Sequence, residues 1–251
     1  MKKLPTNHWL YTLPVAHRGL HGGAVPENSL TAFRLAMEAG YAVETDLHLT
    51  KDGVLVAFHD DTLSRMTGAE GNIKEKTYAE LAKLTLGASQ EKIPTFDEML
   101  ALIDGKVPLL IELKSNGEKG LEEAVCNRLK TYEGAYALQS FDPFILNRVK
   151  KCAPEILRGQ LSSFFEDQNF GFLKRTILKR MTFNFLSKPH FISYNEKNLP
   201  YRLARKKNKP LLCWTVKTEE AYRHAVEVAD NVIFEDIRPT LPAVWTDENN
   251  G

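Results

Sequence analysis

Short apolar stretches alternate with amphipathic helix patterns along almost the whole chain, and this alternation most constrains the fold. The strand-like stretches are 14–18, 42–49, 54–59, 108–113, 135–140, 156–161, 190–194, 210–216 and 231–234. Strands that alternate with helices predict βα units around a parallel sheet. No low-complexity linker divides the sequence, so we expect a single α/β domain over residues 1–251.

One connection is too short for a parallel crossover. Only Thr50-Lys51-Asp52-Gly53 separates 42–49 from 54–59, whereas a crossover needs roughly a dozen residues. Asp-Gly favours a tight hairpin turn, so these two stretches are predicted to pair antiparallel. Removing the hairpin strand leaves eight strands, which predicts a (β/α)8 TIM barrel, a fold of about 250 residues.

Residues 61–92 fit no βα unit. Thr77-x-x-Glu80 and Thr95-x-x-Glu98 are capping-box patterns that predict helix starts. The second belongs to the next barrel helix, and the first lies within 61–92. We therefore expect 61–92 to be a small insertion after the second barrel strand and its hairpin, beside the barrel mouth.

Composition excludes several classes of protein. The 33 basic and 32 acidic side chains give a net charge of +1, which excludes a globally basic nucleic-acid-binding protein. No apolar run approaches the roughly 18–20 residues of a membrane span, and the polar start does not resemble a signal peptide. Cys126, Cys152 and Cys213 lack CxxC spacing, so we expect buried free thiols and a soluble cytoplasmic protein.

Acidic residues cluster at two strand ends. Glu44 and Asp46 are two apart on one strand and therefore share a face, and Glu112 and Lys114 repeat this spacing at another. Carboxylates this close repel one another unless a cation lies between them. Oxygen donors without a thiolate favour Mg²⁺ or Ca²⁺. The alternative is a set of exposed strand-end charges in ordinary salt bridges.

Two histidines lie at the ends of strand-like stretches. His17 precedes Arg18, and His59 closes the hairpin. One imidazole can donate a proton while another accepts one. Arg18 and Lys114 add fixed positive charge that suits an anionic substrate. A metal, two cations and two imidazoles together predict cleavage of a phosphate ester.

An ordered set of motifs runs from about residue 15 to 236. These motifs are His17-Arg18-Gly19, Pro26-Glu27-Asn28-Ser29, Glu44-x-Asp46, Thr50-x-Asp52-Gly53, His59-Asp60, Glu112-x-Lys114 and Trp214. In order and spacing the chain resembles the glycerophosphodiester phosphodiesterase family, a group of metal-dependent (β/α)8 barrels. Each motif alone is weak, but the ordered set is specific.

The resemblance implies roles for individual residues. It implies one divalent cation on Glu44, Asp46 and Glu112, an acid/base pair in His17 and His59, phosphate contacts from Arg18 and Lys114, and substrate-pocket positions for Trp214 and Asn28. Trp214 could equally be a buried barrel residue. Asn28 or Ser29 could equally be only the N-cap of the following helix.

The resemblance also implies a reaction. The expected substrate is a glycerophosphodiester, and the products are glycerol 3-phosphate and an alcohol. The attacking group is water or the glycerol 2-hydroxyl through a cyclic phosphate, and either histidine could be the acid. The alternatives are a lysophospholipase D-type hydrolase acting on lysophospholipids and a non-catalytic phosphate-binding barrel.

The chain departs from the family pattern in two places. The last strand continues as Phe234-Glu235-Asp236-Ile237-Arg238-Pro239, where the family has Thr-Asp followed closely by Pro. Residues 164–186 are rich in Phe, Lys and Arg. This segment could cap the pocket or make peripheral contact with an anionic membrane. We favour a helix whose Phe face packs on the barrel and whose basic face is in water.

Overall fold

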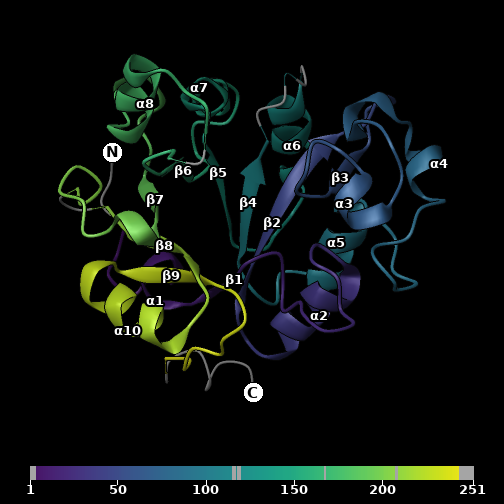
Figure 1. The fold of residues 1–251 in the computed structure, drawn as a ribbon, viewed down its shortest axis with the longest axis horizontal. Coiled ribbons are helices and arrows are strands. Elements are labelled where there is room, and N and C mark those ends of the chain that lie inside the picture. The colour runs from purple at the N-terminus through teal and green to yellow at the C-terminus, as the bar shows by residue number, and fades with distance from the viewer. Residues whose placement is uncertain (1–3, 115–116, 118–119, 167, 207–208, 243–251) are drawn as a thin grey trace. The chain divides into compact units, whose positions relative to one another are not determined.

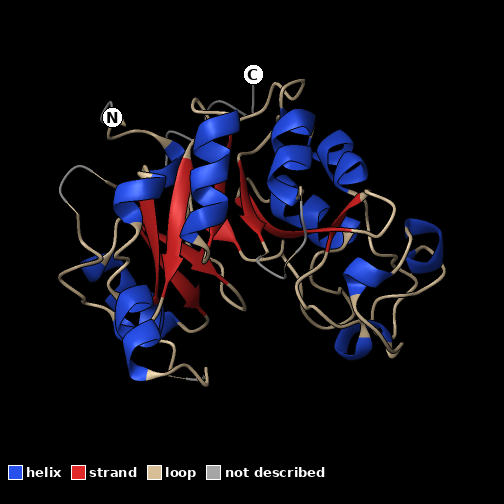
Figure 2. Cartoon of the chain, turned by 90° about the horizontal axis from the view of Figure 1, so that it is seen from above, coloured by secondary structure: helices blue, strands red, loops and turns tan. Residues whose placement is uncertain are grey.

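The computed structural model describes residues 4–114, 117, 120–166, 168–206 and 209–242. It divides into two compact units, Ala16–Tyr136 and Met1–Val15 with Ala137–Gly251. Several helices flank strands (Figure 2).

Every predicted strand is present (Figure 1). The strands are β1 (Val15–Ala16), β2 (Ala42–Leu49), β3 (Leu55–Ala57), β4 (Leu109–Leu113), β5 (Tyr136–Ser140), β6 (Arg158–Ser162), β7 (Phe191–Asn195), β8 (Leu211–Val216) and β9 (Asn231–Phe234). Without the hairpin strand β3, eight strands alternate with helices along the chain. The fold class is therefore the predicted (β/α)8 barrel.

The helices complete this alternation. They are α1 (Trp9–Thr12), α2 (Leu30–Glu38), α3 (Ser64–Thr67), α4 (Tyr78–Leu81), α5 (Phe96–Ile103), α6 (Leu121–Leu129), α7 (Pro143–Cys152), α8 (Phe172–Lys179), α9 (Asn184–Ser187) and α10 (Glu219–Val228), with short 3₁₀ turns at Ile73–Glu75 and Glu196–Asn198. Within the described residues, no helix combines the length and apolar character needed to cross a membrane.

In the unit Ala16–Tyr136, β2 pairs with strands on both sides. It pairs antiparallel with β3, which confirms the predicted hairpin, and parallel with β4. The parallel register places Asp46 opposite Glu112. Both predicted capping boxes are confirmed, at the first turns of α4 and α5. At the hairpin turn, Asp52 accepts a hydrogen bond from the Tyr78 amide at the start of α4 (2.9 Å).

The segment 61–92 contains α3, a 3₁₀ turn and α4, and it has a small apolar core. This core is formed by Val56, Phe58, Leu63, Ile73, Leu81, Leu86 and Ile93. Two of these residues belong to β3 and the residue after it, so the hairpin and the segment share one core. Met66 of α3 packs against it, and this packing fixes the position of α3.

In the other unit, β5 to β9 form a parallel sheet in chain order. Asn231 on β9 donates to the Leu13 carbonyl (2.7 Å) and so holds the N-terminal segment on this sheet. Gly159 on β6 lies under the ring of Phe191. A Cβ at position 159 would lie 2.0 Å from that ring, so the ring can occupy this place only over a glycine.

Two expectations for side-chain burial are wrong. Cys126 and Cys213 are buried, but Cys152 is exposed at the last residue of α7, outside the buried face of that helix. The Phe-rich face of α8 does not pack on the barrel, since Phe172 is 86% and Leu173 is 72% exposed. Phe165, in the preceding loop, is the buried one. The first residues of α8, 172–174, are all exposed, which departs from the usual burial of large apolar side chains.

Candidate metal and phosphate site

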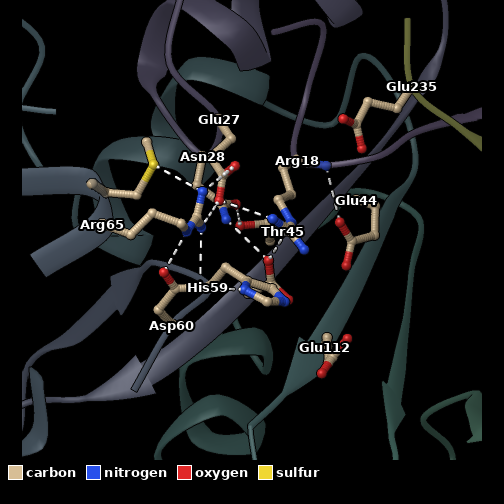
Figure 3. A network of polar contacts seen from close by, with 12 residues as sticks. Arg18, Glu27, Asn28, Glu44, Thr45, His59, Asp60, Arg65, Glu112 and Glu235 are labelled. Carbon is tan, nitrogen blue, oxygen red and sulfur yellow. Dashed lines mark hydrogen bonds and ion pairs between the residues drawn. The ribbon is translucent and has the colours of Figure 1, made fainter. Parts of the chain in front are cut away.

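Three carboxylates from two adjacent strands form the centre of the site. Glu44 and Asp46 lie on β2 and Glu112 on β4. Figure 3 labels Glu44 and Glu112. Each offers an oxygen within 4.8 Å of the others, and all three residues are buried. The two-residue spacing on β2 and the pairing of Asp46 with Glu112 across the ladder produce this convergence.

The electrostatics of this cluster are strongly perturbed. Burial raises the pKa of Glu44 well above its usual value, and the negative charges of Asp46 and Glu112 raise it further. Burial alone would also raise the pKa of Asp46, but Lys114 and Arg18 hold it far below its usual range. His59 and His17 add smaller effects in the same direction. The protein's own cations thus stabilise the charge on Asp46 but leave Glu44 unfavourable as an anion.

The donor set fits a hard divalent cation. Three carboxylates supply only oxygen ligands, the type that Mg²⁺ and Ca²⁺ bind. Asp46 Oδ1 is buried and accepts no well-aligned hydrogen bond, although Lys114 Nζ lies 2.9 Å from it. A buried oxygen without such a bond normally needs a water or an ion. Glu44, Asp46 and Glu112 are therefore the residues that could hold a metal here.

Lys114 connects two of these carboxylates. Its ammonium lies 2.9 Å from Asp46 Oδ1 and 2.9 Å from Glu112 Oε1. Burial would lower the pKa of Lys114, but the two carboxylates raise it above the ordinary value. The ammonium is consequently charged at neutral pH and fixed beside the carboxylates.

Arg18 contacts the cluster through both backbone and side chain. Its amide donates to Glu44 Oε2 (3.0 Å), and its guanidinium Nε lies 3.3 Å from Asp46 Oδ2. Its φ of 55° and the φ of 78° at Gly19 give the chain a tight left-handed turn. A Cβ at Gly19 would lie 2.6 Å from the Ala32 carbonyl carbon, so this turn requires glycine.

Asn28 belongs to the cluster, and Ser29 is the helix cap. The Ser29 hydroxyl accepts from the Ala32 amide at the first turn of α2. The Asn28 side chain instead donates to Asp46 Oδ2 (3.0 Å) and accepts from Thr45 Oγ1 (2.9 Å). Of the two alternatives left open by the sequence, the structure thus gives the capping role to Ser29.

His59 is oriented by the next residue in the chain. Its Nδ1 lies 2.7 Å from Asp60 Oδ1, and its side chain is 34% exposed. Burial opposes ionisation of Asp60, but hydrogen bonds from Arg65 and His59 lower its pKa to about 2. Because that carboxylate is ionised, Nδ1 of the neutral ring carries the proton and Nε2 the lone pair. His17 follows β1 and is partly exposed.

Three contributing residues have no role in the sequence-based prediction. Asp60 orients His59, and Glu27 accepts from Arg18 (2.9 Å). Arg65, on α3, binds both of these carboxylates (Figure 3). Asp60 and Glu27 lie within quoted motifs and could have been included, but nothing in the sequence around Arg65 indicates its contacts.

Trp214 belongs to the other unit, on β8. Its ring packs edge-on against Phe141, with centroids 5.5 Å apart and an interplanar angle of 86°. The side chain is half-buried, and its indole Nε1 is buried without a hydrogen-bond partner among the described residues. Its predicted place near a substrate pocket stays a prediction.

Comparison with known proteins identifies the family. Residues 17–237 match the Glycerophosphoryl diester phosphodiesterase family. A glycerophosphodiester phosphodiesterase of Caldanaerobacter subterraneus is 41% identical over 60% of this chain and 66% of its own length. One from Bacillus subtilis is 30% identical over 82% of this chain and 77% of its own.

A solved structure agrees with these relatives. It is an Oleispira antarctica phosphodiesterase in complex with the product sn-glycerol-3-phosphate. The TM-score is 0.74 at 30% identity, over 88% of this chain and 93% of that one. The family match covers most of the sequence, including every carboxylate, cation and histidine described above. The chain belongs to the glycerophosphoryl diester phosphodiesterase family and is a phosphoric diester hydrolase.

Proposed function

We propose that this protein hydrolyses glycerophosphodiesters to glycerol 3-phosphate and a free alcohol. The observation that carries the proposal is the gathering of three buried carboxylates with Arg18 and Lys114, an arrangement suited to a metal and a phosphate. The Oleispira antarctica relative, solved with sn-glycerol-3-phosphate, supports the choice of product.

The metal in this proposal is Mg²⁺ or Ca²⁺, held by Glu44, Asp46 and Glu112. When bound, the cation supplies positive charge that offsets the build-up of negative charge on the phosphate oxygens. Arg18 and Lys114 contribute further positive charge for the same oxygens. Asn28 keeps Asp46 in place through its amide hydrogen bond.

His17 and His59 divide the proton transfers. One imidazole takes the proton of the attacking hydroxyl as the new P–O bond forms. The other gives a proton to the alkoxide as the bond to the alcohol breaks. The attacking group is water, or the glycerol 2-hydroxyl with a cyclic phosphate that water then opens. Nε2 is the reactive nitrogen of His59, because Nδ1 is bonded to Asp60.

A coupled assay of glycerol 3-phosphate release from glycerophosphocholine tests this function. We expect activity that EDTA removes and that Mg²⁺ or Ca²⁺ restores. His17→Ala and His59→Ala should each lower kcat by roughly 10²–10⁴-fold, with metal binding by calorimetry retained. His224→Ala, which alters a histidine outside the cluster, is the matched control. Wild-type activity in His17→Ala or His59→Ala contradicts the acid/base assignment.

A second candidate substrate is a lysophospholipid at an anionic membrane surface. The exposed apolar side chains Phe172, Leu173 and Phe185 favour it. Residues 168–195 contain five Lys or Arg and no Asp or Glu, so the surroundings of these side chains are basic. Exposed apolar residues beside basic ones are typical of proteins that bind anionic lipid surfaces.

Vesicle co-sedimentation tests this second candidate. We expect binding to vesicles rich in phosphatidylglycerol, little binding to pure phosphatidylcholine, and loss of binding in Phe172→Ser/Leu173→Ser. Val226→Ser, which alters an exposed apolar residue of α10 (54% exposed), is the control. Equal binding of all three proteins to the anionic vesicles contradicts membrane contact through Phe172 and Leu173. Activity on neither glycerophosphocholine nor lysophosphatidylcholine with metal present would favour the non-catalytic barrel.

A further inference from the structure

Arg65 connects the insertion to the site through two carboxylates. Its Nε and Nη2 donate to the two oxygens of Asp60 (2.5 and 3.0 Å). Its Nη2 and Nη1 donate to the two oxygens of Glu27 (2.6 and 3.1 Å). Both contacts are bidentate, which fixes direction as well as distance. In Figure 3 its guanidinium lies between Glu27 and Asp60.

Each of these carboxylates holds a residue of the site. Asp60 Oδ1 accepts from Nδ1 of His59 (2.7 Å), and Glu27 Oε1 accepts from Nη1 of Arg18 (2.9 Å). Without Arg65, the Asp60 side chain could rotate, and the preference for a proton on Nδ1 of His59 would weaken. The partner that orients a histidine also determines which ring nitrogen carries the proton.

The backbone under Arg65 is held independently of these contacts. Leu63, just before α3, and Met66 pack in or against the apolar core of the segment 61–92. The Gly87 amide donates to the Met66 carbonyl (2.6 Å), and the Thr67 amide donates to the Leu63 carbonyl (2.9 Å). The side chain of Arg65 is itself 48% exposed, so it contributes little to that core.

We propose that Arg65 is a positioning residue for the phosphodiesterase reaction, which holds Asp60 so that His59 presents Nε2 to the substrate. The insertion 61–92 thereby contributes a side chain that orients a residue of the site. This inference rests on the proposed acid/base role of His59. A smaller contribution acts through Glu27, which aligns Arg18.

Steady-state kinetics of Arg65→Ala provide the first test. We expect kcat to fall roughly 10–100-fold, by analogy with partners that orient metal-binding histidines, while KM and the thermal midpoint change little. Arg65→Lys should be intermediate, because one ammonium cannot bind both carboxylates in bidentate fashion. Arg128→Ala, which removes a partly exposed arginine paired with Asp97, is the control and should keep wild-type kcat.

A double-mutant cycle separates positioning from other roles. If Arg65 acts through Asp60, Arg65→Ala should have little further effect in an Asp60→Asn background. Fully multiplicative effects on kcat would contradict the proposal. So would a wild-type kcat with a lowered thermal midpoint, the result expected of a residue that only stabilises α3.

The proton on the His59 ring gives a readout independent of turnover. In ¹⁵N NMR spectra of the wild-type protein we expect the neutral ring to carry its proton on Nδ1, and in Arg65→Ala we expect a mixture of tautomers. An unchanged Nδ1 signal in Arg65→Ala overturns the positioning role even if His59→Ala is inactive. If His59→Ala is active and the His59 ring signal changes in Arg65→Ala, the acid/base role is overturned, while the effect of Arg65 on the His59 tautomer stands.

Discussion

The two units surround a buried charged side chain with opposite kinds of groups. In Ala16–Tyr136, Glu44 has a raised pKa because burial and two neighbouring carboxylates oppose its charge. In the other unit, Arg158 on β6 is 3% exposed and donates to the carbonyls of Ser187 (2.9 Å), Ile156 (3.0 Å) and Pro154 (3.3 Å). Glu44 is buried beside groups of like charge, whereas Arg158 is buried beside hydrogen-bond acceptors. Only Glu44 would therefore be stabilised by a bound cation.

This difference predicts which buried charges serve function and which serve stability. Arg158 and Lys150 both donate to carbonyls at the end of α9, where a helix leaves acceptors unsatisfied. Removing such a cation should destabilise the fold. Removing the Glu44 carboxylate, whose charge burial and its neighbours oppose, should abolish activity without destabilising the metal-free protein.

The largest expected effect is that of Glu44→Gln on activity. Glutamine can still accept from the Arg18 amide, but it removes one charge from the set that could hold the metal. We expect activity to fall by more than about 100-fold, beyond the loss typical of residues that only support a metal ligand, and calorimetry to show weaker binding of Mg²⁺ and Ca²⁺.

The stability of Glu44→Gln should not fall with its activity. Chemical denaturation in EDTA should give a free energy of unfolding equal to or above that of the wild type, since repulsion with Asp46 and Glu112 is relieved. A clear loss of stability would mean that the Glu44 carboxylate, like the Arg158 guanidinium, is chiefly structural.

Arg158→Met should show the reverse pattern. It leaves buried carbonyl acceptors unsatisfied, which we expect to lower the free energy of unfolding by about 2–4 kcal/mol, while kcat of the folded protein is retained. Arg223→Met, at an exposed position of α10, should change stability by less than about 0.5 kcal/mol. A large loss of kcat at a temperature where the variant is folded would remove the distinction between the two units.

Ser193→Ala measures the stability that a hydrogen bond between two uncharged side chains contributes in the same unit as Arg158. The Ser193 hydroxyl donates to Gln139 Oε1 (2.9 Å), and both side chains are buried. Its removal should cost about 1 kcal/mol in urea denaturation, with metal binding unchanged. A cost as large as that of Arg158→Met would show that burial of hydrogen-bonded groups, and not their charge, determines stability here.

The smallest effect concerns acid stability. Burial, with the charges of Arg158 and Lys209, lowers the pKa of His190 from 6.5 to about 4, and its Nδ1 accepts from the Arg158 amide (3.2 Å). Between these values the unfolded chain binds a proton that the folded protein does not, so stability decreases as pH falls from 6.5 towards 4.

His190→Asn tests this titration. Asparagine can accept the same hydrogen bond without gaining charge, so its free energy of unfolding should depend less on pH in this window. We expect a difference below about 1 kcal/mol, because the ring is only half-buried and solvent screens its charge. Parallel pH profiles for wild type and variant would assign the acid sensitivity to other groups.

Local patterns in the sequence were enough to predict the strands, the hairpin and the convergence of Glu44, Asp46 and Glu112. Strand periodicity fixes the face of each side chain, and the strands of a βα barrel end on a common side. The separate roles of Asn28 and Ser29 depend on the left-handed backbone of Asn28 (φ 53°), which the sequence alone does not reveal.

Other features depend on how distant segments pack. Arg65 meets its partners only because the core around Ile73 and Leu81 holds α3. The exposure of Phe172 and of Cys152 likewise follows from where their helices begin and end, which periodicity locates poorly. The predicted Phe-packed helix was therefore wrong for α8.

The register of β4 against β2 has a consequence for how this gene can change. A one-residue deletion early in β4 would bring Leu113 opposite Asp46 and shift Glu112 to the other face. The strand would remain apolar and would still pair, so we expect the barrel to fold while its carboxylates no longer meet. Along residues 109–112, changes in length should thus be tolerated far less than changes of one apolar residue for another.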